Sequence, residues 1–430
     1  MYILKKIGLI FLVFVLIFNC SFSYADDLDI TGEAAILIDA ETGQILYEKN
    51  ANMQLFPAST TKIMTGILAI EYGNLNDIIT IDEDVVKRTD GTHIALDVGE
   101  QMSLNNLLHA LLIESANDAA VAIAIHISGS VEDFADLMNE KAKEIGATNT
   151  YFKNPNGLPD ENHLTTAHDL AMIAKYAMQN ETFREIVKNY TYVIPPTNKK
   201  EESRYLKSNN RLLYSNKKIN VDGKVIPIKY EWATGVKSGY TTAAQQCLVS
   251  SAAKGNMKLI CVVLKSCGTD VYVDTHKLLN YGFDNFEKAH LSFKNEFIKN
   301  VSIENGSSSY VSSVASEDLY VTIPKGSRSN IEKIVSLDEN LQAPIIEGQA
   351  LGKIEYFLNG NSLGTINIVS TMNIPEKTVE EKIKESFIFK EWWLVLLILF
   401  TFWRILSTVK RAKRRKRRKN AYIKVNDPIK

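Results

Sequence analysis

Residues Pro57-Ala58-Ser59-Thr60-Thr61-Lys62 place a serine and a lysine three positions apart, directly before the apolar run 63–70. Proline followed by small hydroxyl residues is typical of a helix start. Residues three apart lie on one helix face, so we expect the Ser59 hydroxyl and the Lys62 amine to be neighbours. A neutral amine there can take the serine's proton and make it a nucleophile. A capping serine followed by a solvated lysine fits the same residues, so the motif alone leaves both interpretations open.

Around this motif, the composition is that of a globular protein with an unusual tail. The chain has 430 residues, 45% hydrophobic and 23% charged, which is long enough for two or three domains. Its net charge of −1 conceals an asymmetry, since residues 26–390 hold 35 basic and 48 acidic residues, about −13, and the C-terminus is strongly basic. An acidic body argues against nucleic acid as a partner of the main domains.

The N-terminus has the pattern of a secretory signal. Lys5 and Lys6 precede an apolar core at 7–18, and Ser23-Tyr24-Ala25 puts small residues at the −3 and −1 positions of a cut after Ala25. We therefore expect a signal peptide at 1–25, with an uncleaved anchor as the alternative. Lipidation of Cys20 is disfavoured, because Asn19 stands where a small residue is expected.

The C-terminus predicts a membrane anchor. Residues 392–409 are apolar except for Arg404, with tryptophans at the edges, and the almost entirely basic stretch 410–419 follows. About 18 residues are near the minimum for a spanning helix, and the positive-inside rule puts the tail 410–430 in the cytoplasm and the rest outside the cell. An interfacial helix lying flat on anionic lipid is the alternative. Residues 376–391 place Val379, Ile383 and Phe387 four apart and predict a helical stalk.

Two further polar patterns interrupt apolar stretches. A helical stretch over 103–127 is broken by Glu114-Ser115-Ala116-Asn117-Asp118, which we expect to be buried between two helices. The second pattern, Lys237-Ser238-Gly239-Tyr240, belongs to a predicted strand that precedes a hairpin. There Gly239 would let a substrate backbone come close, and a strand edge can dock an extended peptide. Alone, the first also fits a capping turn and the second a common turn-flanking sequence.

The histidines and cysteines do not suggest a metal site or a disulfide framework. His126, His163 and His168 lack paired ligand spacing, so we interpret them as loop or capping residues and expect no metal or cofactor. Removal of Cys20 with the signal leaves three cysteines, of which Cys247 and Cys261 lie in apolar runs typical of buried strands.

Taken in order, Ser59-Thr60-Thr61-Lys62, Ser115-Ala116-Asn117 and Lys237-Ser238-Gly239 resemble the S-x-x-K, S-x-N and K-[ST]-G motifs of penicillin-recognising serine enzymes. More specifically, the chain resembles the low-molecular-mass penicillin-binding proteins that act as serine-type D-alanyl-D-alanine carboxypeptidases. The resemblance covers residues 30 to about 375 plus the anchor, and Ser238 departs from the family's usual threonine while keeping the hydroxyl.

The resemblance implies an α+β fold, with an antiparallel sheet covered by helices on both faces and a helical subdomain. It also implies a role for each motif residue. Ser59 would be the nucleophile and Lys62 the base, and Ser115 would relay a proton while Asn117 positions the substrate. Lys237 and Ser238 would hold the terminal carboxylate of a peptidoglycan stem peptide. The backbone N–H groups of Ser59 and Tyr240 would form the oxyanion hole, and β-lactam antibiotics would acylate Ser59.

Three rival functions remain open from the sequence. A class A β-lactamase needs a glutamate to activate the deacylating water, and the nearest candidate, Glu161, is followed by Asn162-His163-Leu164, which does not fit the expected context. A transpeptidase differs only in using an amine in place of water. An inactive wall-binding protein would not need the intact Ser59, Lys62, Asn117 and Lys237.

These features divide the chain into six expected parts. A catalytic domain over 26–283 follows the signal peptide 1–25. A small β-sandwich over 284–375 follows, indicated by short strand-like runs near 301–303, 319–323, 353–357 and 363–369 separated by polar turns. The stalk 376–391, the anchor 392–409 and the tail 410–430 complete the chain.

Overall fold

The computed structural model describes residues 28–385 and 391–425. The predicted signal peptide, the stalk residues 386–390 with Phe387, and tail residues 426–430 lie outside the described residues. The chain divides into two compact units, one of residues up to 289 with 321–328, the other of residues 290–320 and 329 onward.

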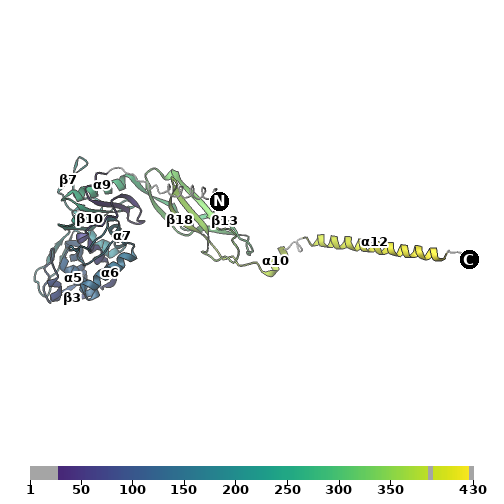
Figure 1. Cartoon of the computed structure of the whole chain (residues 1–430), viewed down its shortest axis with the longest axis horizontal. Coiled ribbons are helices and arrows are strands. Elements are labelled where there is room, and N and C mark those ends of the chain that lie inside the picture. Colours follow the sequence, from purple (N-terminus) through teal and green to yellow (C-terminus); the bar gives the residue numbers. More distant parts are fainter. Residues whose placement is uncertain (1–27, 386–390, 426–430) are drawn as a thin grey trace, which may run out of the picture. The chain divides into compact units, whose positions relative to one another are not determined.

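The first unit is built on a five-stranded antiparallel sheet (Figure 1). The strand order is β2-β1-β11-β10-β9, which brings the N-terminal strands beside the last strands of the unit and leaves β9 at an edge. The five strands are β1 Ala34–Asp39, β2 Ile45–Lys49, β9 Ala233–Thr241, β10 Gln245–Lys254 and β11 Met257–Ser266.

Side-chain alternation along the buried strands creates two cores. In β1, Ile36 and Ile38 belong to one apolar cluster, while Ala35 and Leu37 belong to the other, because successive strand residues point to opposite faces. α9 Asp270–Asn285 packs on the second face, with the β7 Lys218–Val221 and β8 Lys224–Pro227 hairpin. This arrangement confirms the expected α+β fold with helices on both faces of the sheet.

The helices of the first face form the helical subdomain (Figure 1). Capping side chains set several of their starts. For example, Thr166 caps α7 by accepting the Asp169 N–H at 3.0 Å. The helices are α2 Lys62–Tyr72, α3 Glu83–Lys87, α4 Leu104–His109, α5 Asn117–Ser128, α6 Val131–Glu144, α7 Ala167–Ala177 and α8 Glu181–Lys188. Two small antiparallel sheets accompany them, one pairing β3 Ile78–Thr80 with β4 Gln101–Ser103, the other β5 Thr191–Ile194 with β6 Arg204–Lys207. Cys247 and Cys261 are buried in the sheet, as predicted.

The second unit is β-rich, as predicted. Its five-stranded antiparallel sheet has the order β13-β14-β18-β17-β16, with β13 Phe297–Ser302, β14 Tyr310–Ala315, β16 Ile331–Leu337, β17 Ala350–Leu358 and β18 Asn361–Ser370. A separate two-stranded ribbon pairs β12 Phe286–Ser292 with β15 Leu319–Pro324, and both strands have residues in each unit. Leu291 and Leu319, which belong to the second unit, pack against this sheet's apolar cluster. The strand-like runs of the sequence did not reveal β14 and β16.

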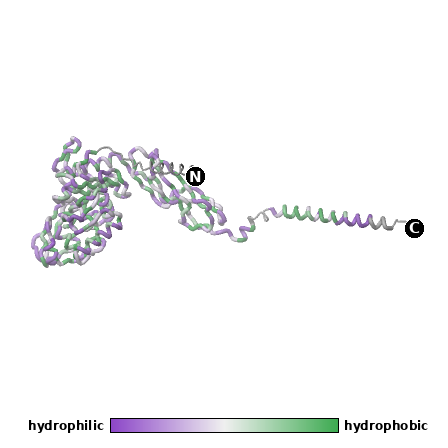
Figure 2. Tube along the Cα trace, viewed as in Figure 1, coloured by the Kyte–Doolittle hydropathy of each residue, from purple (hydrophilic) through white to green (hydrophobic). Residues whose placement is uncertain are grey.

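Two helices follow the β-rich sheet. The stalk residues form α10 Val379–Glu385, on which Val379 and Ile383 are exposed. α12 Trp392–Val425 then runs without a break from the apolar segment into the basic one, a change that Figure 2 shows along the helix. By length and composition, Trp392–Lys419 is the one described helix that could cross a membrane.

Candidate active site

Ser59 and Lys62 lie at the junction of two helical segments. A 3₁₀ turn, Ala58–Thr61, carries the serine, and Lys62 is the first residue of α2. The Lys62 Nζ lies 3.1 Å from the Ser59 Oγ. Lys62 is fully buried while Ser59 is half-buried, so the amine approaches the hydroxyl from the protein interior. The structure therefore places the two residues as neighbours, although the serine lies in the turn and not in the α-helix.

The hydrogen bonds of Lys62 suit a neutral amine. Its Nζ also lies 2.6 Å from the Asn117 Oδ1 and 2.7 Å from the Asn156 carbonyl oxygen, two atoms that can only accept. A neutral amine has two N–H bonds for these acceptors, which leaves its lone pair for the Ser59 hydroxyl. Burial lowers the pKa of Lys62 well below its usual value, and the positive charge of Lys237 lowers it further, against an opposing effect of Asp118. A neutral amine so placed is able to accept a proton from the hydroxyl.

The second motif is a tight turn between helices. A π-helical turn, Ala110–Glu114, ends at Ser115, whose φ of 69° is left-handed, and α5 begins at Asn117. Ser115 and Asn117 are each 5% exposed, which confirms the predicted burial of this polar patch. Among the described residues, the Ser115 hydroxyl has no hydrogen-bond partner, whereas the Asn117 amide group donates to the Asp90 carbonyl. The turn thus brings Asn117 to Lys62 and leaves the Ser115 hydroxyl available.

Asp118 holds the neighbouring loop in place, a role that the sequence did not suggest. Its buried carboxylate accepts the backbone N–H groups of Ile94 and Leu96, each at 3.1 Å. The Asn117 N–H in turn donates to the Thr92 carbonyl at 2.7 Å. A carboxylate inside a long apolar run was the only available signal, because the loop at 90–96 lies over twenty residues earlier in the chain.

The third motif lies on the edge strand β9. Lys237 is buried, its Nζ donates to the Ser238 carbonyl at 3.0 Å, and Ser238 is partly exposed. Burial lowers the pKa of Lys237 to about 7, although the negative charge of Glu114 acts in the opposite direction. The Tyr240 side chain is exposed, so a role for Tyr240 in the site depends on its backbone. An exposed edge and a cationic lysine suit the docking of a peptide that ends in a carboxylate.

Gly239 has a more specific role than the one expected from sequence. A Cβ at this position would lie 2.7 Å from the Ser59 backbone nitrogen and 3.0 Å from the Ala58 Cβ. The chain's own serine turn therefore approaches Gly239 closely, a contact that the sequence did not suggest; the approach of a substrate backbone stays a prediction. The contact brings the backbone of β9 against the backbone of Ser59.

The loop after α6 contributes residues that the sequence indicated only as a loop. The Pro155 carbonyl accepts the Thr65 hydroxyl at 2.6 Å, and the Asn156 carbonyl accepts from Lys62. Gly157, at φ +85°, passes so close to the Ala58 carbonyl that a Cβ there would lie 1.9 Å from the oxygen. The backbone carbonyl of Asn156 carried no sequence signal, because any residue type supplies one.

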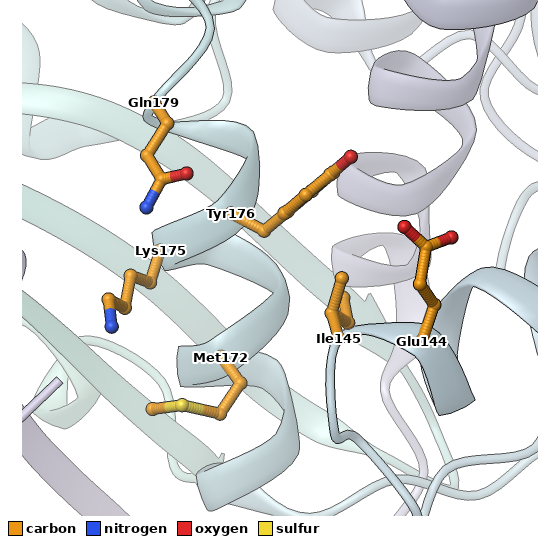
Figure 3. Close-up of a pocket in the computed structure, with 6 residues that line it drawn as sticks. All are labelled: Glu144, Ile145, Met172, Lys175, Tyr176 and Gln179. Carbon is orange, nitrogen blue, oxygen red and sulfur yellow. The ribbon is translucent and has the colours of Figure 1, made fainter. Parts of the chain in front are cut away.

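A separate surface pocket of about 260 Å³ lies along α6 and α7 (Figure 3). It is lined by Glu144, Ile145, Met172, Lys175, Tyr176 and Gln179. None of these residues contacts Ser59, Lys62 or Lys237 through a hydrogen bond, and the Tyr176 hydroxyl already donates to Glu71 at 2.5 Å. In the described part of the chain, no three His, Cys, Asp or Glu side chains are grouped to hold a metal ion.

The fold and the site together define a penicillin-recognising serine enzyme. The fold is an antiparallel sheet with helices on both faces, and the site combines a buried lysine hydrogen-bonded to a serine, an S-x-N turn and a K-S-G edge strand. Residues 21–268 match the family model of D-alanyl-D-alanine carboxypeptidases, and residues 286–376 match that of the C-terminal domain of penicillin-binding protein 5. The chain belongs to the D-alanyl-D-alanine carboxypeptidase family.

Individual relatives agree with this assignment. The chain is 36% identical to D-alanyl-D-alanine carboxypeptidase DacF of Bacillus subtilis, over 77% of this chain and 82% of the relative. It resembles the crystal structure of penicillin binding protein 5 from Haemophilus influenzae with a TM-score of 0.69 and 31% identity, covering 81% of this chain and 99% of the other. A DD-transpeptidase structure from Streptomyces K15 matches with a TM-score of 0.55 and 30% identity, covering 60% of this chain and 99% of the other.

Proposed function

We propose that the protein is a serine carboxypeptidase that removes the terminal D-alanine from peptidoglycan stem peptides through an acyl-enzyme on Ser59. The observation that carries this proposal is the contact between the buried Lys62 amine and the Ser59 hydroxyl. Ser59 Oγ attacks the carbonyl carbon between the two D-alanines while its proton passes to Lys62. Collapse of the tetrahedral intermediate breaks the amide bond, leaves the shortened peptide esterified to Ser59 and releases D-alanine.

The remaining motif residues serve the same step. Ser115 passes a proton to the leaving amine, and Asn117 orients Lys62 and the substrate. Lys237 and Ser238 hold the terminal carboxylate. The backbone N–H groups of Ser59 and Tyr240 stabilise the oxyanion; this role is supported by Gly239, whose lack of a side chain allows the two backbones to lie close together.

Water then hydrolyses the ester, and β-lactams acylate the same serine. Glu161, the nearest candidate for the deacylating glutamate of a class A β-lactamase, is exposed at the surface. A penicilloyl-enzyme on Ser59 therefore persists. A DD-transpeptidase is among the structures similar to this chain, and an amine in place of water would turn the same acyl-enzyme into a transpeptidation intermediate.

We further propose the membrane arrangement and its segments. The signal peptide 1–25 directs export, the catalytic domain 26–283 and the β-rich domain 284–375 lie on the wall side, and the stalk 376–391 leads to the anchor 392–409. The tail 410–430 is cytoplasmic. The apolar-to-basic order along α12 supports this orientation.

Mass spectrometry of the purified protein tests the catalytic proposal. Incubated with a penicillin, the protein should gain one penicilloyl group on Ser59, and with a stem pentapeptide it should release D-alanine. The Ser59→Ala variant should do neither. An unmodified Ser59 and no D-alanine release would refute the proposal, rapid penicillin turnover would indicate a β-lactamase, and transfer to an added amine would reveal transpeptidation.

A further inference from the structure

His163 is a buried histidine that the catalytic roles leave unused. It is 1% exposed, and its ring packs edge-on against Phe152 with 5.6 Å between centroids. Its Nε2 lies 2.9 Å from the Oγ1 of Thr61, the residue directly before Lys62. Its Nδ1 lies 3.2 Å from the backbone nitrogen of Lys153. The ring therefore joins the serine–lysine turn to the loop after α6.

These contacts define the protonation state of the ring. The Lys153 N–H can only donate, so Nδ1 is the acceptor and the ring proton is on Nε2, which donates to Thr61. Burial lowers the pKa of His163 to about 4, which keeps the ring neutral at ordinary pH. The ring thus donates to Thr61 and accepts from Lys153 at the same time.

The same loop carries the carbonyl that binds Lys62. At its near end, two hydrogen bonds attach the loop to α2. The Thr65 hydroxyl donates to the Pro155 carbonyl, and the Lys62 amine donates to the Asn156 carbonyl. At its far end, His163 is attached to Thr61. Thr61, Lys62 and Thr65 lie within the first turns of one helical segment, so the loop is fixed to that segment at both ends.

We propose that His163 is a positioning residue for acylation, which acts through Thr61 to keep the Asn156 carbonyl on the Lys62 amine. With one N–H held by Asn156 and the other by Asn117, the amine lone pair is directed at the Ser59 hydroxyl. The backbone bridges Leu55–Thr165 and Tyr151–Leu164 hold the ends of the loop. Without the His163–Thr61 bond, the loop's remaining hydrogen bonds to the Thr61–Thr65 segment are those at Pro155 and Asn156, so the Asn156 carbonyl can shift and the amine can rotate away from Ser59. The inference rests on the proposed roles of Ser59 and Lys62.

The test separates the chemical step from binding and from folding. Stopped-flow acylation by a fluorescent penicillin gives the non-covalent dissociation constant and the acylation rate constant, and intact mass gives the fraction of active protein. His163→Phe keeps the ring volume but removes both nitrogens, so the acylation rate constant should fall about tenfold, with binding unchanged. His163→Gln can still donate and accept, and should recover most of that loss.

Thr61→Val tests whether His163 acts through Thr61. It should lower the acylation rate constant about as much as His163→Phe, and the double variant should be no slower than either single one, because both remove the same bond. His168→Phe is the matched control and should acylate at the wild-type rate, because the His168 ring contacts the Asp169 carboxylate and not Thr61, Lys62 or Asn156.

Two results would overturn the inference: wild-type acylation by His163→Phe, or effects of Thr61→Val and His163→Phe that multiply. If His163→Phe does not fold, a His163→Gln variant that is no faster than Thr61→Val would also count against it. These results are distinct from failure of the proposed function, in which the wild-type protein itself would not be acylated on Ser59.

Discussion

The proposed mechanism makes opposite demands on two buried lysines. In it, Lys62 must be neutral to accept a proton, whereas Lys237 must be charged to hold a carboxylate. Burial lowers the pKa of both residues, and the charge of Lys237 lowers that of Lys62 further. The negative charge of Glu114 raises the pKa of Lys237 and so opposes the effect of burial. Both requirements are met if only Lys237 carries a positive charge, because that charge disfavours protonation of Lys62.

This division predicts a bell-shaped pH dependence of kcat/KM for peptide hydrolysis. The rate should rise with pH as Lys62 loses its proton and fall above about pH 7 as Lys237 loses its charge in the free enzyme. Glu114→Gln removes the negative charge that raises the pKa of Lys237, so the falling limb should move to lower pH. Steady-state assays across the pH range measure both limbs. A falling limb that Glu114→Gln leaves in place would contradict the assignment to Lys237.

Gly239 predicts a contrast between neighbouring substitutions on β9. Gly239→Ala puts a Cβ 2.7 Å from the Ser59 nitrogen, which must displace the serine turn and should slow acylation about a hundredfold. Ser238→Thr keeps the hydroxyl and is the matched control, with only a modest effect expected. Acylation rates with a fluorescent penicillin measure both. Equal rates for the two variants would show that the close approach at Gly239 is unimportant.

At the scale of elements, the catalytic cluster depends on segments that secondary structure does not hold together. The loop at 90–96 lies against the start of α5 through the Asp118 carboxylate and the Asn117 amide. The loop at 154–157 lies against the start of α2 in the same way, through Lys62 and Thr65. The two loops are therefore held near the nucleophile by hydrogen bonds at the N-termini of α5 and α2, and not by strand pairing.

Asp118→Asn should affect both stability and the pH profile. The amide keeps one acceptor but loses the charge that receives two loop N–H groups, so the free energy of unfolding should fall by about 1–3 kcal/mol. Because Asp118 raises the pKa of Lys62, its loss should lower that pKa further and move the acid limb of acylation to lower pH. Denaturant unfolding and acylation profiles measure the two effects. The matched control, Asp136→Asn at an exposed position of α6, should change neither the free energy of unfolding nor the pH profile. An acid limb that moves to higher pH in Asp118→Asn would contradict the prediction.

At the scale of the whole molecule, catalysis and attachment belong to different parts of the chain. The residues that contact Ser59, Lys62 and Lys237 all lie in the first unit. The apolar part of α12, 18 residues at about 1.5 Å each, gives about 27 Å, close to the hydrocarbon thickness of a bilayer. The β-rich unit stands between them in the sequence and contributes no residue to the cluster.

A chain that ends at Pro375 should therefore be soluble after signal cleavage and keep the acylation rate of the full-length protein. Removal of α12 takes away the only described helix long and apolar enough to span a bilayer, and leaves every cluster residue in place. Fractionation of cells that express both forms, followed by penicillin labelling, measures location and activity together. Continued membrane retention of the shortened chain would contradict the C-terminal anchor.

The sequence by itself determined the motifs and the apolar helix, and the resemblance that the motifs carry implied the α+β class. Ser59 and Lys62 are linked by local geometry, and the length of the apolar run at 392–409 is likewise a local property. The β-rich unit shows the limit of such patterns, because β14 and β16 carry serine, lysine and glutamate at several positions and lack a clear apolar alternation.

Only the tertiary structure decided the surroundings that suit Lys62 to the proposed role of base. Its partners lie 55 and 94 residues away, and the burial that lowers its pKa is the sum of contacts from segments that no local pattern relates. The approach of Gly239 to Ser59 and the contact of His163 with Thr61 have the same origin. A residue's pKa and its close contacts both depend on the groups that folding brings near it. The neighbouring residues in the sequence do not determine which groups these are.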